Sequence, residues 1–313
     1  MPERADLRLG DIQKTLFLPL WGRAEESRKP KPLLVDEAAL RIMTQVAFDF
    51  SPLTKDIDAL TQLGWVKRSL LYDREVRDFL RLYPEGTIVN IGCGLDTTFE
   101  RTDNGMLKWY DLDLPDVIAL RRRFVEETER RRFVAASFLE DDWLEGIEVS
   151  GNVLFMAAGV FYYFEEPEIK AFIARLADRY PGSEIVFDAS SPLGVKVCNK
   201  RVVDRSGLDE RSHLVWCLRR TDDLASWDPR IRILNTYYYY RTQVSGLRNK
   251  LMGMLADFLR IQYMIHLRLG ATPIAKPDSA RHSGPNRTTF EPAGGGEAPL
   301  PPPLGLRLLT SVG

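Results

Sequence analysis

The chain has 313 residues, with 43 lysines and arginines against 44 aspartates and glutamates, so its formal net charge is −1. This length suits one large domain or two small ones. The near-zero charge argues against a dedicated nucleic-acid binder, which usually carries a clear basic excess. Three histidines, with neither a C-x-x-C nor an H-E-x-x-H motif, leave little from which to build a zinc site.

Cysteine spacing and hydropathy indicate in which cellular compartment the protein is expected. Cys93, Cys198 and Cys217 are odd in number and widely spaced, which fits a reducing compartment better than a disulfide framework. The first residues lack the apolar segment of a signal peptide. No stretch approaches the roughly 20 apolar residues that span a bilayer. We therefore expect a cytoplasmic protein with no metal, no nucleic-acid partner and no membrane partner.

The first 85 or so residues are expected to form a helical addition or lid that precedes the sheet. From residue 86 to 270, short β-branched runs alternate with longer amphipathic stretches, a pattern typical of βαβ units around a parallel sheet. The predicted strands are Thr87–Ile91, Lys108–Asp113, Phe133–Ser137, Asn152–Ala157 and Glu184–Asp188, with late strands within 231–240 and 263–267. Together they predict a doubly wound α/β fold with a mostly parallel, seven-stranded sheet.

Two helices are predicted between these strands. One runs from Pro115, which suits a first helical turn, to about Arg131. The arginine triplets 121–123 and 130–132 flank several glutamates and are interpreted as its solvated, charged face. The other helix runs from about Glu166 to Tyr180.

The last 43 residues differ from the rest of the chain. Residues 271–313 contain 8 of the 19 prolines and 6 of the 22 glycines, and show no helical or strand period. The combined proline and glycine content of this segment exceeds the roughly 25–30% that is typical of disordered segments without a sequence repeat. We predict a disordered tail after one folded unit.

A glycine turn follows the first predicted strand. Gly92 and Gly94 allow the backbone to turn sharply and to approach a bulky ligand. Asp113 lies 21 residues after Gly92, at the end of the second strand, where a carboxylate can accept ribose hydroxyls. Asp111, two residues earlier on the same face, is the competing candidate. Thr97 replaces the third glycine of a dinucleotide fingerprint, so the pattern fits S-adenosylmethionine (SAM) better than NAD.

Three segments then carry a family resemblance. Asn90–Arg101 (NIGCGLDTTFER), Trp109–Val117 (WYDLDLPDV) and Ala157–Phe164 (AAGVFYYF) stand in that order. They resemble the leucine carboxyl methyltransferase superfamily, most closely its bacterial branch of polyketide O-methyltransferases. The likeness covers roughly residues 15 to 270, and it implies a class I SAM-dependent methyltransferase.

The resemblance implies roles for individual residues toward SAM. Arg68 matches the arginine that clamps the SAM carboxylate, a task suited to the two-donor guanidinium. The other residues implied to bind the cofactor are Gly92, Cys93, Gly94, Asp113 with its neighbour Leu114, Ser137, Phe138 and Ala158, with Asp111 kept as the alternative ribose ligand. Two positions depart from the family: Ala158 stands where many members have glutamate, and Thr98 where relatives usually have arginine.

The sequence says less about the methyl acceptor than about the cofactor. A carboxylate acceptor is already ionised at neutral pH, whereas a phenol benefits from a base. His213 is the only histidine in the region expected to cover the pocket, and a lone histidine there is more often structural. Tyr162 and Tyr163 follow the fourth strand and are candidates for substrate positioning.

Three functional hypotheses remain. The first is O-methylation of a small molecule, a carboxylate or phenol such as a polyketide. The second is methylation of a protein C-terminal carboxylate, as in the eukaryotic branch. The third is a degenerate member that binds SAM without catalysis, suggested by Ala158 and Thr98. A dehydrogenase is disfavoured because the third glycine is missing.

Overall fold

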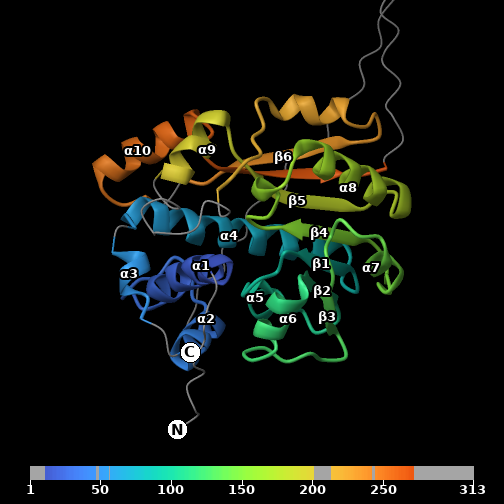
Figure 1. The fold of residues 1–313 in the computed structure, drawn as a ribbon, viewed down its shortest axis with the longest axis horizontal. Helices are drawn as coiled ribbons and strands as arrows, with labels where there is room; N and C mark the ends of the chain where they lie inside the picture. The colour runs from blue at the N-terminus through green and yellow to red at the C-terminus, as the bar shows by residue number, and fades with distance from the viewer. Residues whose placement is uncertain (1–10, 47–48, 56, 201–212, 242–243, 271–313) are drawn as a thin grey trace, which may run out of the picture. The chain divides into compact units, whose positions relative to one another are not determined.

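A seven-stranded sheet forms the centre of the computed structural model (Figure 1). The structure describes residues 11–46, 49–55, 57–200, 213–241 and 244–270. The strands are β1 (Thr87–Ile91), β2 (Lys108–Asp113), β3 (Arg131–Ala135), β4 (Val153–Ala157), β5 (Glu184–Ala189), β6 (Arg232–Tyr238) and β7 (Tyr263–Arg268). The predicted disordered tail, 271–313, lies outside the described residues.

The strand order is β3-β2-β1-β4-β5-β7-β6. Strands β1 to β5 are parallel, and β7 runs antiparallel between β5 and β6. Every residue of β1, β4 and β5 is buried, which explains why their sequences are mainly apolar. The predicted α/β fold class is confirmed. The order reverses between β1 and β4, and this switch point is where such sheets bind ligands.

Helices cover the sheet and its carboxyl edge. They are α1 (Asp11–Ser27), α2 (Glu37–Gln45), α3 (Ser51–Thr54), α4 (Ala59–Leu82), α5 (Thr98–Thr102), α6 (Pro115–Arg121), α7 (Asp142–Glu145), α8 (Glu166–Arg179), α9 (Pro192–Cys198) and α10 (Leu247–Phe258), with short 3-10 turns η1 (Phe161–Tyr163) and η4 (Thr221–Ser226). Figure 1 shows α1 to α3 with α9 and α10 on one side of the sheet. None of the described helices combines the length and the apolar composition that a membrane-spanning segment requires.

Buried ion pairs fasten the N-terminal helices to the loop after β1. Arg23 Nε lies 2.8 Å and Arg101 Nη1 2.7 Å from Asp36 Oδ2, and the Thr97 hydroxyl donates to the same oxygen. Burial opposes ionisation of Asp36, but the two guanidiniums outweigh it and lower the pKa of this carboxyl. Thr97, the residue in place of a third glycine, therefore holds the loop against α2.

The helix that begins at Pro115 is shorter than predicted. It ends at Arg121, and β3 starts at Arg131 in place of Phe133, pairing with Trp109 of β2. The prediction of one helix to about Arg131 is wrong, because the chain must return early to extend the sheet. The other predicted strands and the helix at 166–180 agree with the structure within two residues.

The arginine triplets flanking that segment do not form a solvated face as a whole. Arg121 and Arg131 are fully buried, with Arg121 Nη2 2.9 Å and Arg131 Nε 2.8 Å from Asp111 Oδ2. Trp109 Nε1 and Asn90 Nδ2 donate to the other oxygen of Asp111, at 2.9 and 3.1 Å. The solvated interpretation is wrong for these two arginines, since a buried carboxylate requires partners.

A second buried cluster joins α4 to the sheet. His266 of β7 lies with Nδ1 2.8 Å from Glu75 Oε2 of α4, and with Nε2 2.9 Å from Glu184 Oε2 of β5. Burial disfavours the imidazolium, but the hydrogen bonds with both carboxylates outweigh it and raise the pKa of His266. The same contacts lower the pKa values of Glu75 and Glu184.

This cluster predicts a pH-dependent stability difference between the wild type and His266→Gln. A raised histidine pKa stabilises the fold fully below the unfolded value of about 6.5, and this contribution is lost as pH rises through the folded pKa. We expect the variant to be about 1–3 kcal/mol less stable near pH 6. The difference should shrink at alkaline pH. Urea unfolding across a pH series measures it, and a pH-independent difference would contradict the assignment.

Candidate active site

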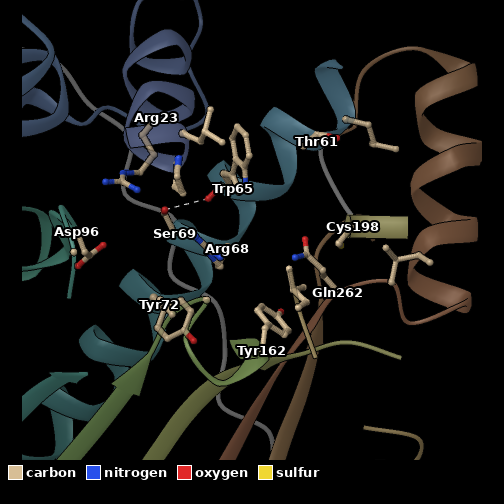
Figure 2. Close-up of a pocket in the computed structure, with 18 of the residues that line it drawn as sticks. Arg23, Thr61, Trp65, Arg68, Ser69, Tyr72, Asp96, Tyr162, Cys198 and Gln262 are labelled. Atoms are coloured by element: carbon tan, nitrogen blue, oxygen red, sulfur yellow. Dashed lines mark hydrogen bonds between the residues drawn. The ribbon is translucent and has the colours of Figure 1, made fainter. Parts of the chain in front are cut away.

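A cavity of about 370 Å³ lies beyond the carboxyl ends of β1 and β4. Its walls come from α1, α4, the turns after β1 and β4, and the region of α9 and α10. Figure 2 shows Arg23, Asp96 and Arg68 toward one side, and Thr61, Cys198 and Gln262 toward the other. This is the crevice at which the strand order predicts ligand binding.

The glycine turn after β1 forms one wall. Gly92 and Gly94 have φ values of +59° and +45°, in the left-handed region that favours glycine. A Cβ on Gly92 would lie 2.5 Å from Val160 Cγ2, so no side chain fits there. Cys93 also lines the cavity, but its side chain is buried, and burial raises the pKa of its thiol well above the usual range. The turn therefore offers backbone to a ligand.

Asp113 holds this turn from the end of β2. Its carboxylate accepts the Gly94 N–H and the Leu114 N–H, each at 2.8 Å. Burial raises the pKa of this carboxyl above its ordinary value, although both N–H groups act in the opposite direction. Asp113 is only half-buried, and Leu114 is exposed. Both lie beside the glycine turn but outside the lining of the cavity itself.

Asp111, the alternative ribose ligand, is not available to a ligand. It is 0% exposed, and its oxygens are taken up by Arg121, Arg131 and two further donors. The structure contradicts a cofactor role for Asp111. It pairs instead with two buried arginines, of which Arg131 also contacts Glu100.

Ser137 and Phe138 lie after β3, away from the cavity lining. Phe138 is buried in an aromatic cluster, with its ring centroid 4.6 Å from that of Phe164 and 4.8 Å from that of Phe172. Ser137 is half-buried and accepts the Leu139 N–H at 3.3 Å. Their implied role in binding the cofactor stays a prediction.

Arg68, on α4, points into the cavity (Figure 2). Its side chain is only 14% exposed, and among the described residues its one ionic partner is Asp188, with Nη1 3.6 Å from Oδ2. It donates no hydrogen bond to the described residues. A buried guanidinium with free donors is costly unless an anion completes it, so Arg68 is suited to a ligand carboxylate.

Asp188, which sequence reasoning missed, links several walls of the cavity. It lies near the end of β5, accepts the Gly159 N–H at 2.6 Å, and accepts a hydrogen bond from the Tyr239 hydroxyl. Burial raises the pKa of Asp188, while Arg68 opposes this rise. Because Gly159 and Arg68 both line the cavity, one carboxylate positions the turn after β4 and the clamp on α4. A buried acid directly after the apolar run Ile185–Phe187 was the available signal.

The aromatic residues after β4 also reach the cavity. Tyr162 is buried and donates to Ala189 O at 3.4 Å, whereas Tyr163 is 43% exposed. Both line the cavity, as do Ala158 and Thr98. His213 is half-buried and is not part of the lining.

The wall opposite the glycine turn is mainly apolar. Its large apolar side chains come from α9, α10 and the segment before β7: Leu193, Val197, Met252, Leu255, Leu259 and Ile261. Polar groups are fewer there and include Thr61, Tyr240 and Gln262. None of these residues was identified from the sequence, because no local motif marks them.

Sequence comparison decides the family. A profile of the family "Leucine carboxyl methyltransferase" matches residues 17–177, just over half of the chain. The chain belongs to this family. The leucine carboxyl methyltransferase match spans α1, α4, the glycine turn and the strands up to β4, so it includes both Arg68 and Asp113.

Individual relatives agree with this assignment. The chain is 31% identical over 190 residues to tetracenomycin polyketide synthesis O-methyltransferase TcmP of Streptomyces glaucescens, covering 59% of this chain and 68% of that protein. It is 26% identical over 217 residues to the S-adenosyl-L-methionine-dependent methyltransferase dpfgK of Gibberella zeae, covering 63% and 72%.

Solved structures share the fold. A DUF574 family protein from Streptomyces avermitilis has a TM-score of 0.52 at 11% identity, covering 82% of this chain and 97% of that one. A putative methyltransferase from Thermobifida fusca has a TM-score of 0.52 at 15% identity, covering 80% and 94%. At these identities the likeness supports the fold alone.

Family and fold together identify the chain as a SAM-dependent methyltransferase, and SAM is its cofactor. The cavity fits this cofactor on its own evidence. The glycine turn presents backbone to the cavity at positions where no side chain fits, and Arg68, which donates no hydrogen bond to the described residues, faces the cavity where a carboxylate can pair with it.

Proposed function

We propose that this methyltransferase methylates an oxygen, either a carboxylate or a phenol, of a small and largely apolar molecule of polyketide type. The apolar wall opposite the glycine turn carries this proposal, because it matches an acceptor with an extensive hydrocarbon or aromatic surface. The name of TcmP, a polyketide O-methyltransferase, supports the same class of acceptor.

The chain's own residues bind and orient the reactants. Arg68 would hold the carboxylate of SAM, and Asp113 its ribose hydroxyls, while Gly92 and Gly94 let the backbone approach. When bound, SAM supplies a methyl group activated by its sulfonium. Trp65 and Tyr163 present aromatic surface to the cavity, which favours a cation nearby and excludes water. The catalytic requirement is to hold the acceptor oxygen about 3–3.5 Å from the methyl carbon.

The described lining favours a carboxylate over a phenol. It contains no histidine, and His213 lies outside it. A carboxylate with an ordinary pKa near 4 is already ionised and needs no general base, whereas a phenol with a pKa near 10 gains from one. Proton removal is therefore not a task that these residues must perform.

Product chemistry tests the proposal. The purified protein is incubated with methyl-labelled SAM and a panel of polycyclic carboxylic acids and phenols, and the products are then treated with alkali. A methyl ester releases labelled methanol, whereas an aryl methyl ether is stable. Label transfer to one of these acceptors is expected. Stoichiometric label on protein would favour the C-terminal methyltransferase hypothesis. SAM binding without transfer to any acceptor would favour the degenerate one.

A further inference from the structure

Helix α10 presents its large apolar side chains to solvent. Leu247, Leu251, Met254, Leu255 and Phe258 recur three or four residues apart on one face, with exposures from 47% for Leu255 to 82% for Phe258. An ordinary surface helix buries such a stripe against the core. Seven of the fifteen exposed large hydrophobic side chains of the described residues lie on α9 or α10.

The opposite face of α10 packs on the domain with small or polar groups. Gly253 is buried against the Tyr240 side chain, where an added Cβ would lie 2.7 Å from Tyr240 Cβ. Asp257 is buried and accepts the Tyr240 N–H at 3.0 Å. The helix is therefore anchored in this orientation, and the apolar stripe is its outward face.

Basic side chains flank this stripe. At 100° per residue, Arg248 and Lys250 fall on opposite edges of the apolar face. Within the described segments 191–200 and 244–260, every exposed ionisable side chain is basic: Lys196, Lys200, Arg248 and Lys250. This local excess contrasts with a chain whose net charge is −1. Asp58, an exposed acid at the rim of the cavity, is engaged in capping α4 by accepting the Thr61 N–H.

The stripe is continuous with the cavity. Leu255 belongs to the exposed face and also lines the cavity, as do the exposed Met252 of α10 and Leu193 of α9. The apolar surface therefore extends from the outside of the molecule into the apolar wall of the cavity.

We propose that the surface formed by α9 and α10 docks on an anionic lipid bilayer. Leu247, Leu251 and Phe258 would enter the boundary between headgroups and acyl chains, and Arg248 and Lys250 would contact lipid phosphates. A second copy of the chain fits less well, because every exposed ionisable side chain described on this surface is basic, so two such surfaces would repel each other. This proposal replaces, for this surface, the expectation of no membrane partner. If the proposed function holds, a lipophilic acceptor can pass from the bilayer into the cavity without crossing water.

Co-sedimentation of the full-length protein with vesicles tests the docking without any acceptor. Vesicles of phosphatidylcholine mixed with phosphatidylglycerol are expected to bind the protein, and vesicles of phosphatidylcholine alone to bind it weakly. The double variant R248Q/K250Q should lower the partition coefficient about 30-fold, since each basic residue near such a surface contributes about fivefold. The triple variant L247S/L251S/F258S should lower it at least as much.

Matched controls separate this surface from others. Leu82→Ser removes an apolar side chain that is 71% exposed at the end of α4, and it should leave vesicle binding unchanged. Absence of wild-type binding, or binding that survives both α10 variants, would overturn the proposal. Light scattering after size-exclusion chromatography measures the oligomeric state. If the wild type is a dimer that the α10 variants dissociate, and no vesicle binding is seen, the surface is assigned to a second copy of the chain instead. Failure of the methyl-transfer assay leaves these readouts unaffected.

Discussion

Arg68→Ala is expected to weaken SAM binding by about 10- to 150-fold, the range for loss of hydrogen bonds to a charged group. The guanidinium is largely buried and faces the cavity, and its one ionic partner within the described part of the chain is Asp188, at 3.6 Å. Titration calorimetry with SAM measures the effect. Arg68→Lys should give an intermediate loss, because an ammonium keeps the charge without the two-donor geometry.

Two comparisons make the Arg68 result specific. Arg81→Ala on the same helix removes an arginine whose side chain is 74% exposed, and it should leave SAM affinity unchanged. 5′-Methylthioadenosine lacks the methionine carboxylate, so its affinity should be nearly the same for the wild type and for Arg68→Ala. An equal loss for both ligands would mean that Arg68 supports the pocket without clamping a carboxylate.

Asp111→Asn is expected to lower the free energy of unfolding by about 3–5 kcal/mol, because it leaves the buried Arg121 without its ion-pair partner and leaves Arg131 with Glu100 alone. Burial alone disfavours the charged form of Asp111, but the two arginines outweigh it and lower the pKa of this carboxyl. Denaturant unfolding at neutral pH measures the loss. The protein that remains folded should still bind SAM.

Asp113→Asn provides the matched contrast, two residues along the same strand. It should change stability by less than about 1 kcal/mol, since Asp113 is half-buried and its two partners are neutral N–H groups. Its affinity for SAM should fall at least tenfold, through loss of the charged acceptor for the ribose. The opposite pattern, with Asp111→Asn stable but deficient in SAM binding, would exchange the two roles.

The centre of the sheet could be predicted because β1, β4 and β5 are short, mainly apolar runs buried on both faces. Runs such as Thr87–Ile91 and Val153–Ala157 leave few other interpretations. The end of α6 could not be predicted, because the run after Arg121 is charged in a way that also suits a solvated helix. What decides it is Asp111, a distant carboxylate that requires both Arg121 and Arg131.

The site residues also fall into those that local sequence predicts and those that depend on distant contacts. The glycine turn and Asp113 are local features, and their spacing was sufficient to propose SAM. Arg68 came only from the family resemblance, since one arginine on a long helix looks like any other. Asp188 was missed because its contacts with Gly159 and Arg68 depend on three elements far apart in the chain. The outward stripe of α10 has the composition of a core helix, so its exposure is visible only in three dimensions.

The two walls of the cavity come from separate parts of the chain. The wall that carries Arg68 and the glycine turn is built from α4 and the ends of β1 and β4, whereas most of the apolar wall belongs to segments that follow β5 and β6. Replacement of Leu193 or Met252 can therefore reshape the acceptor space while Arg68 and Gly92 stay in place. Because of this division, substitutions in evolution or in protein engineering can change the acceptor specificity of the enzyme while its SAM-binding residues are kept.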